Sequence, residues 1–530
     1  MPLVTDRLMQ IARSNPDHAF VVDPVDGQQS YAQVAEKVEY LIGGLAAAGI
    51  GRGDVVIVQL PNWTAFVVVH LALSAIGAVT ATIPIVYRDR ELAQVLRLTD
   101  ARMLVVPARF RGHDYLEMAN VLKAASPSLR HVLCVSRDEA PANHPTFLSY
   151  EGLIAQERTI TWQDTKPGDD ELTALGFTSG TTGNLKAAMY STRVLDATNA
   201  GLRDRYGLNE DDIAFACSPL GHAVGFTHAL RMTLTIGGAM VMMDRWDCEK
   251  ALAIIEAHRC TYMACATPFL NDMVYHSSLA VHGRLPSLRL FLCGGATIPR
   301  QLMKDARERL PYTFTSPLWG MTECGGVTTC PFGAPEEKVF GTDGLPCGGM
   351  ELKVVDSAGA RLAPGQEGEL MVRGPMLTLG YYRQPELSAE SFLKDGFFRT
   401  GDLARMDDDG YVRITGRIKD LIIRGGVNIA PAEIEDALFK HPRIESVAVV
   451  GFTDARLGER ICAYVVLSEG AEIGLAEVQA WMKASGVSQQ KWPERIEIVE
   501  RLPMTTSGKV QKFILRDMAA QRHSPGFGAS

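Results

Sequence analysis

Short apolar runs alternate with helix-like stretches along the first part of this chain, to about residue 340. Strands that are buried on both faces of a parallel sheet read as nearly continuous apolar runs, and helices cross over between them. The alternation therefore predicts an α/β fold in which largely parallel sheets are covered by helices. The runs that we interpret as strands are Asp54–Leu60, Ala101–Val106, His131–Val135, Ala239–Met243 and Leu288–Cys293.

The uncharged segment Ala65–Tyr87 is long enough to cross a bilayer. However, Gly77 and Pro84 interrupt it, and it contains one histidine and several hydroxyl side chains. A buried helix, a turn at Gly77 and a buried strand account for the same pattern inside an α/β domain. We therefore expect no membrane span here.

A chain of 530 residues exceeds what one hydrophobic core supports, so more than one domain is expected. Pro, Gly and Asp become frequent beyond about residue 340, which predicts a β-rich subdomain over about 340–415. This subdomain would belong to a large N-terminal domain of residues 1–417, followed by a small mobile α+β domain of residues 418–530. The small domain is expected to hold a helix at Pro431–Lys440 and strands at Val447–Gly451 and Ile461–Leu467.

The charge and cysteine content exclude several classes of protein. A net charge of −8 and a pI of about 5.9 argue against a surface built for nucleic acid. The ten cysteines include no CxxC pair, which favours reduced thiols over a disulfide framework or a zinc site. The N-terminal segment MPLVTDRLMQ lacks the basic start and apolar run of a secretion signal, so a cytoplasmic protein is expected.

The segment Phe177–Lys186, FTSGTTGNLK, combines hydroxyl side chains, two glycines and a lysine directly after a strand-like run. Glycines allow close backbone approach, hydroxyl and backbone N–H groups donate to anions, and Lys186 adds a positive charge. The pattern predicts a polyphosphate-binding loop. It is not the P-loop of nucleotide triphosphatases, because the GxxxxGK[ST] pattern is absent.

Further motifs follow this loop in a definite order: Trp319–Glu323 (WGMTE), Arg399–Asp402 (RTGD), Gly416–Asp420 (GRIKD), Arg424–Gly426 (RGG) and Thr506–Lys509 (TSGK). In this order and spacing, the chain resembles the adenylate-forming superfamily of acyl-CoA synthetases, peptide-synthetase adenylation domains and luciferases. The segments PLGHAVGF and KWPERIEIVERLPMTTSGKVQK look most like those of cyclohexanecarboxylate and short- or medium-chain acyl-CoA ligases. The resemblance implies ATP, Mg²⁺ and coenzyme A as cofactors.

By this resemblance, one set of residues would bind the pyrophosphate of ATP: Thr178, Ser179, Gly180, Thr181, Thr182, Gly183 and Lys186. Thr322 would donate to the α-phosphate, and Glu323 would bind Mg²⁺, a hard cation that prefers oxygen ligands. Asp402 would accept both ribose hydroxyl groups, with Arg417 as a second contact. The adenine pocket would be formed by Trp319, which stands where the family usually has Tyr, and by Gly294, Gly295, Ala296, Gly320 and Met321.

The resemblance also implies two catalytic states. Lys509 would be the main catalytic residue, because its ammonium group can contact both the substrate carboxylate and the α-phosphate. Lys419 would act as the hinge of a domain rotation that brings Arg424, Gly425 and Gly426 to the pantetheine of coenzyme A. His222 would gate the acyl pocket or orient the carboxylate, although a purely structural histidine is the alternative. The phosphate loop departs from the common TTGxPK pattern, because Leu185 replaces Pro.

The segments that would form the acyl pocket are mostly apolar or small: His222–Thr227, Thr267–Asn271, Cys293–Thr297 and Trp319–Val327. They offer no acidic residue where the ammonium group of an amino acid would need one. The sequence thus indicates an ATP-dependent carboxylate–CoA ligase for a hydrophobic alicyclic or short- to medium-chain acid. The alternatives are an aromatic-acid CoA ligase, an enzyme that loads the pantetheine of a separate carrier protein, and a nucleotide sensor. A homodimer stays open.

Overall fold

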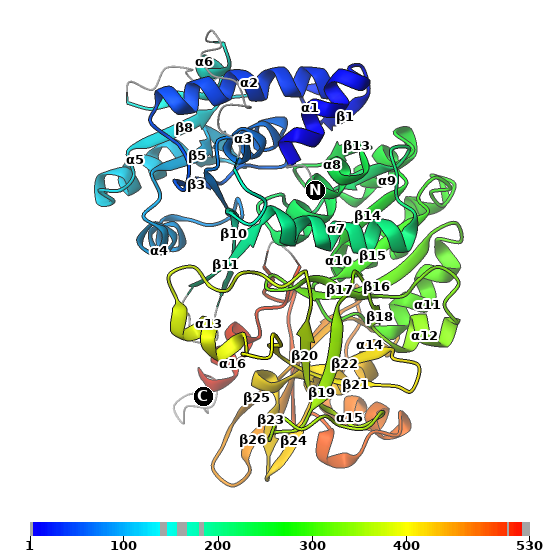
Figure 1. Ribbon diagram of the computed structural model, residues 1–530. Helices are drawn as coiled ribbons and strands as arrows, with labels where there is room; N and C mark the ends of the chain where they lie inside the picture. Colours follow the sequence, from blue (N-terminus) through cyan, green and yellow to red (C-terminus); the bar gives the residue numbers. More distant parts are fainter. Residues whose placement is uncertain (1–3, 138–145, 156–166, 180–184, 506–507, 522–530) are drawn as a thin grey trace.

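The computed structural model describes residues 4–137, 146–155, 167–179, 185–505 and 508–521. Two large sheets lie in the N-terminal part, with a small antiparallel sheet and a compact C-terminal unit below them (Figure 1). The α/β fold class expected from the sequence is confirmed. Within the described residues, no helix is both long and apolar enough to span a bilayer.

The first large sheet has the strand order β11-β10-β4-β3-β5-β8-β9 and is parallel except for the β10–β11 pair. Its strands are β3 (Val55–Val58), β4 (Val79–Thr82), β5 (Met103–Pro107), β8 (His131–Val135), β9 (Leu148–Ser149), β10 (Leu172–Ser179) and β11 (Leu185–Ser191). The helices between them are α3 (Thr64–Ala75), α4 (Asp89–Thr99), α5 (Tyr115–Ala125) and α6 (Tyr150–Ile154).

The uncharged segment folds as expected. Every residue of α3 is buried, Gly77 turns the chain with φ of +70°, and β4 is buried on both faces. An apolar stretch enclosed on all sides needs no polar face, which explains its resemblance to a membrane span.

The second large sheet has the order β18-β17-β16-β15-β14-β12-β13-β1-β2, and its central strands are parallel. Its strands are β1 (Ala19–Asp23), β2 (Gly27–Ser30), β12 (Ile213–Ala216), β13 (Ala239–Met242), β14 (Tyr262–Cys265), β15 (Leu290–Gly294), β16 (Phe314–Met321), β17 (Gly325–Thr329) and β18 (Leu345–Pro346). Its helices include α1 (Val4–Ser14), α2 (Tyr31–Ala47), α7 (Thr192–Tyr206), α9 (Cys248–Ala257), α10 (Thr267–Tyr275) and α11 (Arg300–Arg309). All five strands predicted from apolar runs are present, within two residues at each end.

Beyond residue 340 the chain forms two smaller sheets, drawn in yellow to red in Figure 1. The first is antiparallel: β19 (Glu351–Val355), β20 (Gly368–Arg373), β21 (Phe398–Met406) and β22 (Val412–Arg417). The second contains β23 (Ile422–Arg424), β24 (Val427–Ile429), β25 (Ile444–Asp454), β26 (Gly458–Leu467) and β27 (Arg495–Ile498), with α14 (Pro431–Phe439), α15 (Leu475–Ala484) and α16 (Lys512–Gln521). The helix and both strands expected in the C-terminal part are present. The domain boundary at residues 417/418 stays a prediction.

Candidate functional site

A small enclosed cavity lies where several parallel strands of the second sheet end. Open parallel sheets usually bind ligands at the carboxyl ends of their strands, because the loops there can diverge and leave a crevice. The cavity measures about 10 Å³, room for about one water molecule. It is lined by Ser218, Pro219, His222, Val224, Ala266, Gly294, Gly295 and Lys509.

Lys509 enters this cavity from the C-terminal part of the chain. The preceding Gly508 has φ of +77°, and a Cβ there would lie 3.0 Å from Pro268 and 3.2 Å from Ala266. A Cβ built on Gly295 would stand 3.8 Å from Cε of Lys509. Gly508 is thus the residue that lets the Lys509 segment approach the strand ends so closely.

The charges around Lys509 show that the nucleotide motifs converge. Burial, and to a smaller extent the charge of Arg417, lower the pKa of Lys509 to about 8, against the opposite effect of Glu323 and Asp402. Three charged side chains from segments far apart in the sequence thus act electrostatically on Lys509. A lysine with this pKa is still largely protonated at neutral pH.

His222 shares the cavity with Lys509. Burial, and to a smaller extent the charge of Lys509, lower the pKa of His222 to about 3, so the imidazole is neutral at physiological pH. Its Nδ1 accepts a hydrogen bond of 3.4 Å from the backbone N–H of Val224. With Nδ1 as the acceptor, the proton of the neutral ring lies on Nε2, which is therefore a donor.

Trp319 and Arg417 both contact the carboxylate of Asp402, which is 3% exposed. The indole Nε1 of Trp319 donates to Oδ2 over 2.9 Å, and Nε of Arg417 lies 3.0 Å from Oδ1. Asp402 and Arg417 face each other in the β21–β22 register. The three residues proposed to bind adenine and ribose therefore form one connected group.

The predicted phosphate loop lies between β10 and β11, whose antiparallel register places Thr178 opposite Lys186. Gly180, Thr181, Thr182 and Gly183 lie outside the described residues, and for Ser179 only the strand backbone is described. Nζ of Lys186 lies 5.1 Å from the centre of the Tyr381 ring.

Thr322 and Glu323 form the turn between β16 and β17, beside the phosphate hairpin. A Cβ on Gly176 of β10 would lie 3.0 Å from Cγ2 of Thr322. The hydroxyl of Tyr190 donates to the carbonyl of Thr322 over 2.6 Å. Gly320 and Met321 lead into this turn, and a Cβ on Gly320 would come within 2.0 Å of the Gly325 carbonyl. Ala296 is partly buried in the loop after β15.

Glu323 is chemically suited to a magnesium ion bridged to phosphates. It is 5% exposed, and its Oε1 accepts a hydrogen bond of 2.9 Å from Tyr381. Among the described residues, no group of three or more potential metal ligands occurs. Mg²⁺ commonly takes one or two carboxylates and completes its shell with water and substrate phosphates, so a single carboxylate fits this use.

The proposed hinge and pantetheine residues are not among those that line the cavity, although the charge of Lys419 acts on Lys509. Burial and the neighbouring Arg417 lower the pKa of Lys419, which is in the short helix Ile418–Asp420. Arg424 precedes the Gly425–Gly426 turn between β23 and β24, and its guanidinium pairs with Glu494 over 2.9 Å. Both partners belong to the C-terminal unit, so the structure does not bring Arg424 to the nucleotide residues.

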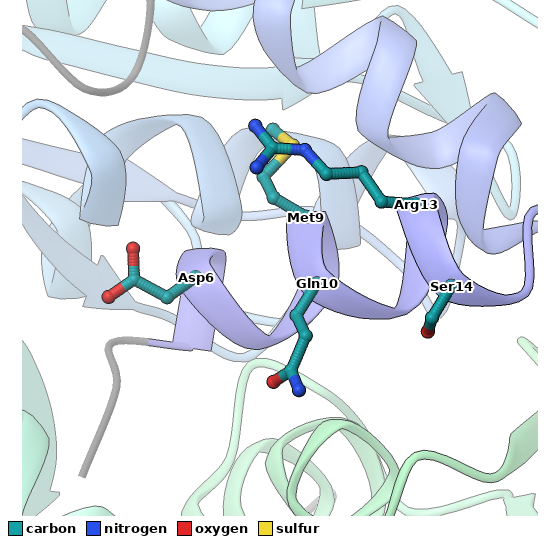
Figure 2. Close-up of a pocket in the computed structure, with 5 residues that line it drawn as sticks. All are labelled: Asp6, Met9, Gln10, Arg13 and Ser14. Carbon is teal, nitrogen blue, oxygen red and sulfur yellow. The ribbon is translucent and has the colours of Figure 1, made fainter.

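A larger and more open pocket, of about 350 Å³, is lined by side chains of α1 (Figure 2). Asp6, Met9, Gln10, Arg13 and Ser14, which line it, all belong to this one helix. A surface provided by a single helix does not enclose a ligand, so this pocket is not part of the candidate site.

Sequence reasoning missed several residues around the site. Ser218 and Ala266 line the cavity, but small residues after a strand carry no recognisable signal. Tyr190 and Tyr381 touch the Thr322–Glu323 turn from distant segments. Their positions relative to the motifs could have been found only from the pairing of β11 with the segment around Gly380.

Comparison with known proteins identifies the family. The chain belongs to the AMP-binding enzyme family, whose family model matches residues 8–382, and the C-terminal domain of AMP-binding enzymes matches residues 433–509. This confirms the resemblance seen in the sequence motifs.

Two curated relatives and one solved structure are similar over nearly the whole chain. The medium-chain fatty-acid–CoA ligase of Escherichia coli (strain K12) is 38% identical, over 97% of this chain and 90% of its own length. The salicyl-AMP ligase / salicyl-S-ArCP synthetase of Mycobacterium tuberculosis is 35% identical, over 95% and 88%. ATP-bound MatB of Rhodopseudomonas palustris aligns with a TM-score of 0.85 at 28% identity, over 97% and 98% of the two chains.

Proposed function

We propose that this protein is an AMP-forming acid–thiol ligase that activates a hydrophobic carboxylic acid with ATP and transfers the acyl group to coenzyme A. The observation that carries the proposal is the convergence of Lys509, Arg417, Asp402 and Glu323 next to an enclosed pocket that contains His222. The names of the similar ligases and the ATP-bound neighbour support the same chemistry.

In the first step a carboxylate oxygen attacks the α-phosphorus, and pyrophosphate leaves with the electrons of the broken P–O bond. Both reactants are anions, so the enzyme must neutralise charge and fix the geometry. The ammonium group of Lys509, which lines the cavity, would bridge the carboxylate and the α-phosphate. Nε2–H of His222 would donate to the second carboxylate oxygen.

The remaining residues would fix the nucleotide. Asp402 and Arg417 would bind the ribose, the indole of Trp319 would face the adenine, and Lys186 would hold the departing pyrophosphate. Glu323 would hold a magnesium ion, which supplies further charge neutralisation at the phosphates. Thr322 adjoins this carboxylate and would donate to the α-phosphate.

In the second step the thiol of coenzyme A loses its proton to solvent and attacks the acyl carbonyl carbon, and AMP leaves with the electrons of the broken C–O bond. In the structure Lys509 lines the cavity, where it would restrict the access of the incoming thiol to the acyl group. We propose that the C-terminal unit turns about Lys419 after adenylation, which withdraws Lys509 and brings Arg424, Gly425 and Gly426 to the pantetheine.

The lining of the pocket favours an acid without a second charge. In the described part of the chain, the residues that line it are apolar or small, apart from Ser218, the neutral His222 and the catalytic Lys509. A charged substituent on the acyl group would have no partner here. The proposed substrate class is therefore a hydrophobic alicyclic or short- to medium-chain acid, and the Escherichia coli relative is named for medium-chain fatty acids.

The test uses the full-length protein with Mg²⁺, ATP and a panel of alicyclic, aromatic, short-chain and medium-chain acids. Each acid is assayed for pyrophosphate release, AMP formation and thioester product, with either free coenzyme A or a phosphopantetheinylated carrier protein. The proposal predicts thioester on coenzyme A with a hydrophobic acid. Thioester on the carrier alone would instead establish the carrier-loading function named for the mycobacterial relative, and no AMP with any acid would exclude both. Cytoplasmic location and a homodimer stay predictions.

A further inference from the structure

Tyr381 contacts two opposite charges that the proposed function uses separately. Its hydroxyl donates to Oε1 of Glu323 over 2.9 Å, and the centre of its ring lies 5.1 Å from Nζ of Lys186. The side chain is buried, with 4% exposed.

The backbone around Tyr381 is attached to both charged segments. The amide of Thr378 donates to the carbonyl of Glu323 over 3.0 Å. Leu379, Gly380 and Tyr382 exchange backbone hydrogen bonds with Ala187 and Met189 of β11, the strand that carries Lys186, over 2.8–3.0 Å. The Tyr381 amide donates to the Ser388 hydroxyl over 2.8 Å. These bonds fix the position of the ring relative to both Lys186 and Glu323.

Lys186 and Glu323 carry opposite charges and therefore attract each other. Lys186 on β11 and Glu323 on the turn between β16 and β17 would gain Coulomb energy by pairing, and the pair would withdraw both from the nucleotide. Among the ion pairs between described residues, none joins Lys186 to Glu323. Tyr381 interacts favourably with both charges. The face of its ring attracts the cation of Lys186, and its hydroxyl donates to the carboxylate of Glu323.

We propose that Tyr381 is a positioning residue that holds Lys186 and Glu323 apart, so that the lysine stays available for pyrophosphate and the carboxylate for the magnesium ion. The inference rests on the proposed function, because it concerns the Mg²⁺ and phosphate affinity of that same site. The effect of Tyr381 would pass through the two charged side chains that it contacts.

Two substitutions separate the two contacts. Tyr381→Phe removes the hydroxyl and keeps the ring, so Glu323 loses its donor while Lys186 keeps its cation–π partner. Tyr381→Leu removes both. Tyr382→Phe is the matched control, since Tyr382 is the next residue, pairs with Ala187 through its backbone, and stacks its ring on Arg383 instead.

The main readout is binding and requires no turnover. At fixed ATP, the rise in unfolding temperature is measured as a function of free Mg²⁺ for each variant. Loss of a hydrogen bond to a charged group is expected to raise the Mg²⁺ midpoint of Tyr381→Phe about tenfold. The unfolding temperature without ligand should change little, and saturating Mg²⁺ should restore the binding of ATP. Tyr382→Phe should keep the wild-type midpoint.

A second readout uses pyrophosphate as an inhibitor of adenylation. Tyr381→Phe should keep the wild-type inhibition constant because Lys186 is undisturbed, whereas Tyr381→Leu should weaken inhibition by about threefold or more, in line with a partly desolvated cation–π contact. A wild-type Mg²⁺ midpoint in Tyr381→Phe would overturn the inference. Equal losses in unfolding temperature and maximal rate, with no change in midpoint, would also overturn it by showing a merely structural role. If wild type makes no AMP with any acid, the proposed function fails, yet the Mg²⁺ midpoints still decide about Tyr381.

Discussion

The indole Nε1 of Trp319 donates to Oδ2 of Asp402 over 2.9 Å. Family resemblance assigns Trp319 to adenine stacking, yet its hydrogen bond engages the residue proposed to bind ribose. A phenylalanine at this position could stack but could not donate. The tryptophan therefore links the proposed base pocket to the carboxylate proposed to bind ribose, whose other oxygen faces Arg417 at 3.0 Å.

The first prediction follows from this hydrogen bond. Trp319→Phe should raise the KM for ATP about tenfold, because a hydrogen bond to a buried charged group is lost while stacking is kept. Steady-state kinetics of acid-dependent pyrophosphate release would measure it. In an Asp402→Asn background, Trp319→Phe should raise the KM for ATP by a clearly smaller factor, because the hydrogen bond between the two residues is already weakened. Fully additive effects would show that the contact has no energetic consequence for nucleotide binding.

The second prediction concerns Lys509. Lys509→Met should lower the rate of adenylation at least about a hundredfold, as expected for loss of a charge aimed at developing negative charge. Thioester formation from supplied acyl-adenylate should stay close to wild type. Rapid-quench measurements of the two half-reactions provide the comparison. Comparable losses in both steps would contradict the assignment of Lys509 to adenylation.

The pH dependence of adenylation gives the third prediction. Burial lowers the pKa of Lys509 from its usual 10.5 to about 8, so the charged form is present below pH 8 and is lost as the pH rises through that value. The kcat/KM for ATP, which reports the free enzyme, should therefore fall above about pH 8. Lys509→Arg keeps its charge over the whole range and should be slower but flat above pH 8. If Lys509→Arg shows the same decline in kcat/KM, the decline must come from the titration of another group.

Local patterns in the sequence were sufficient for the fold but not for the contacts between motifs. The apolar run at His131–Val135 is a strand with these same bounds, because burial on both faces leaves a strong local signal. Asp402 and Trp319 could be assigned from motifs, but the hydrogen bond between them depends on the packing of β16 against β21. Tyr381 carries no motif signal of its own. Its role is visible only when β11, the Thr322–Glu323 turn and the segment around Gly380 are placed together.

The fourth prediction concerns the link between Arg413 of β22 and Asp436 of α14. Their guanidinium and carboxylate groups are 2.8 Å apart, and the pair spans the domain boundary expected at residues 417/418. If the C-terminal unit rotates between the two steps, this pair must break. Asp436→Asn should therefore favour the thioester-forming arrangement and raise the ratio of thioester rate to adenylation rate about threefold, the size expected for a partly exposed ion pair.

The fifth prediction concerns how the ratio of thioester rate to adenylation rate depends on pH through Asp436. Burial raises its pKa to about 6, so the carboxylate is charged above that value and becomes neutral as the pH falls through it. In wild type, lowering the pH below about 6 should weaken the pair with Arg413 and raise the same rate ratio, whereas Asp436→Asn should show no such change. Single-turnover measurements of both half-reactions between pH 5 and 8 would test this. If the ratio of thioester rate to adenylation rate changes with neither the substitution nor the pH, the Arg413–Asp436 pair does not hold the C-terminal unit in its proposed adenylation arrangement.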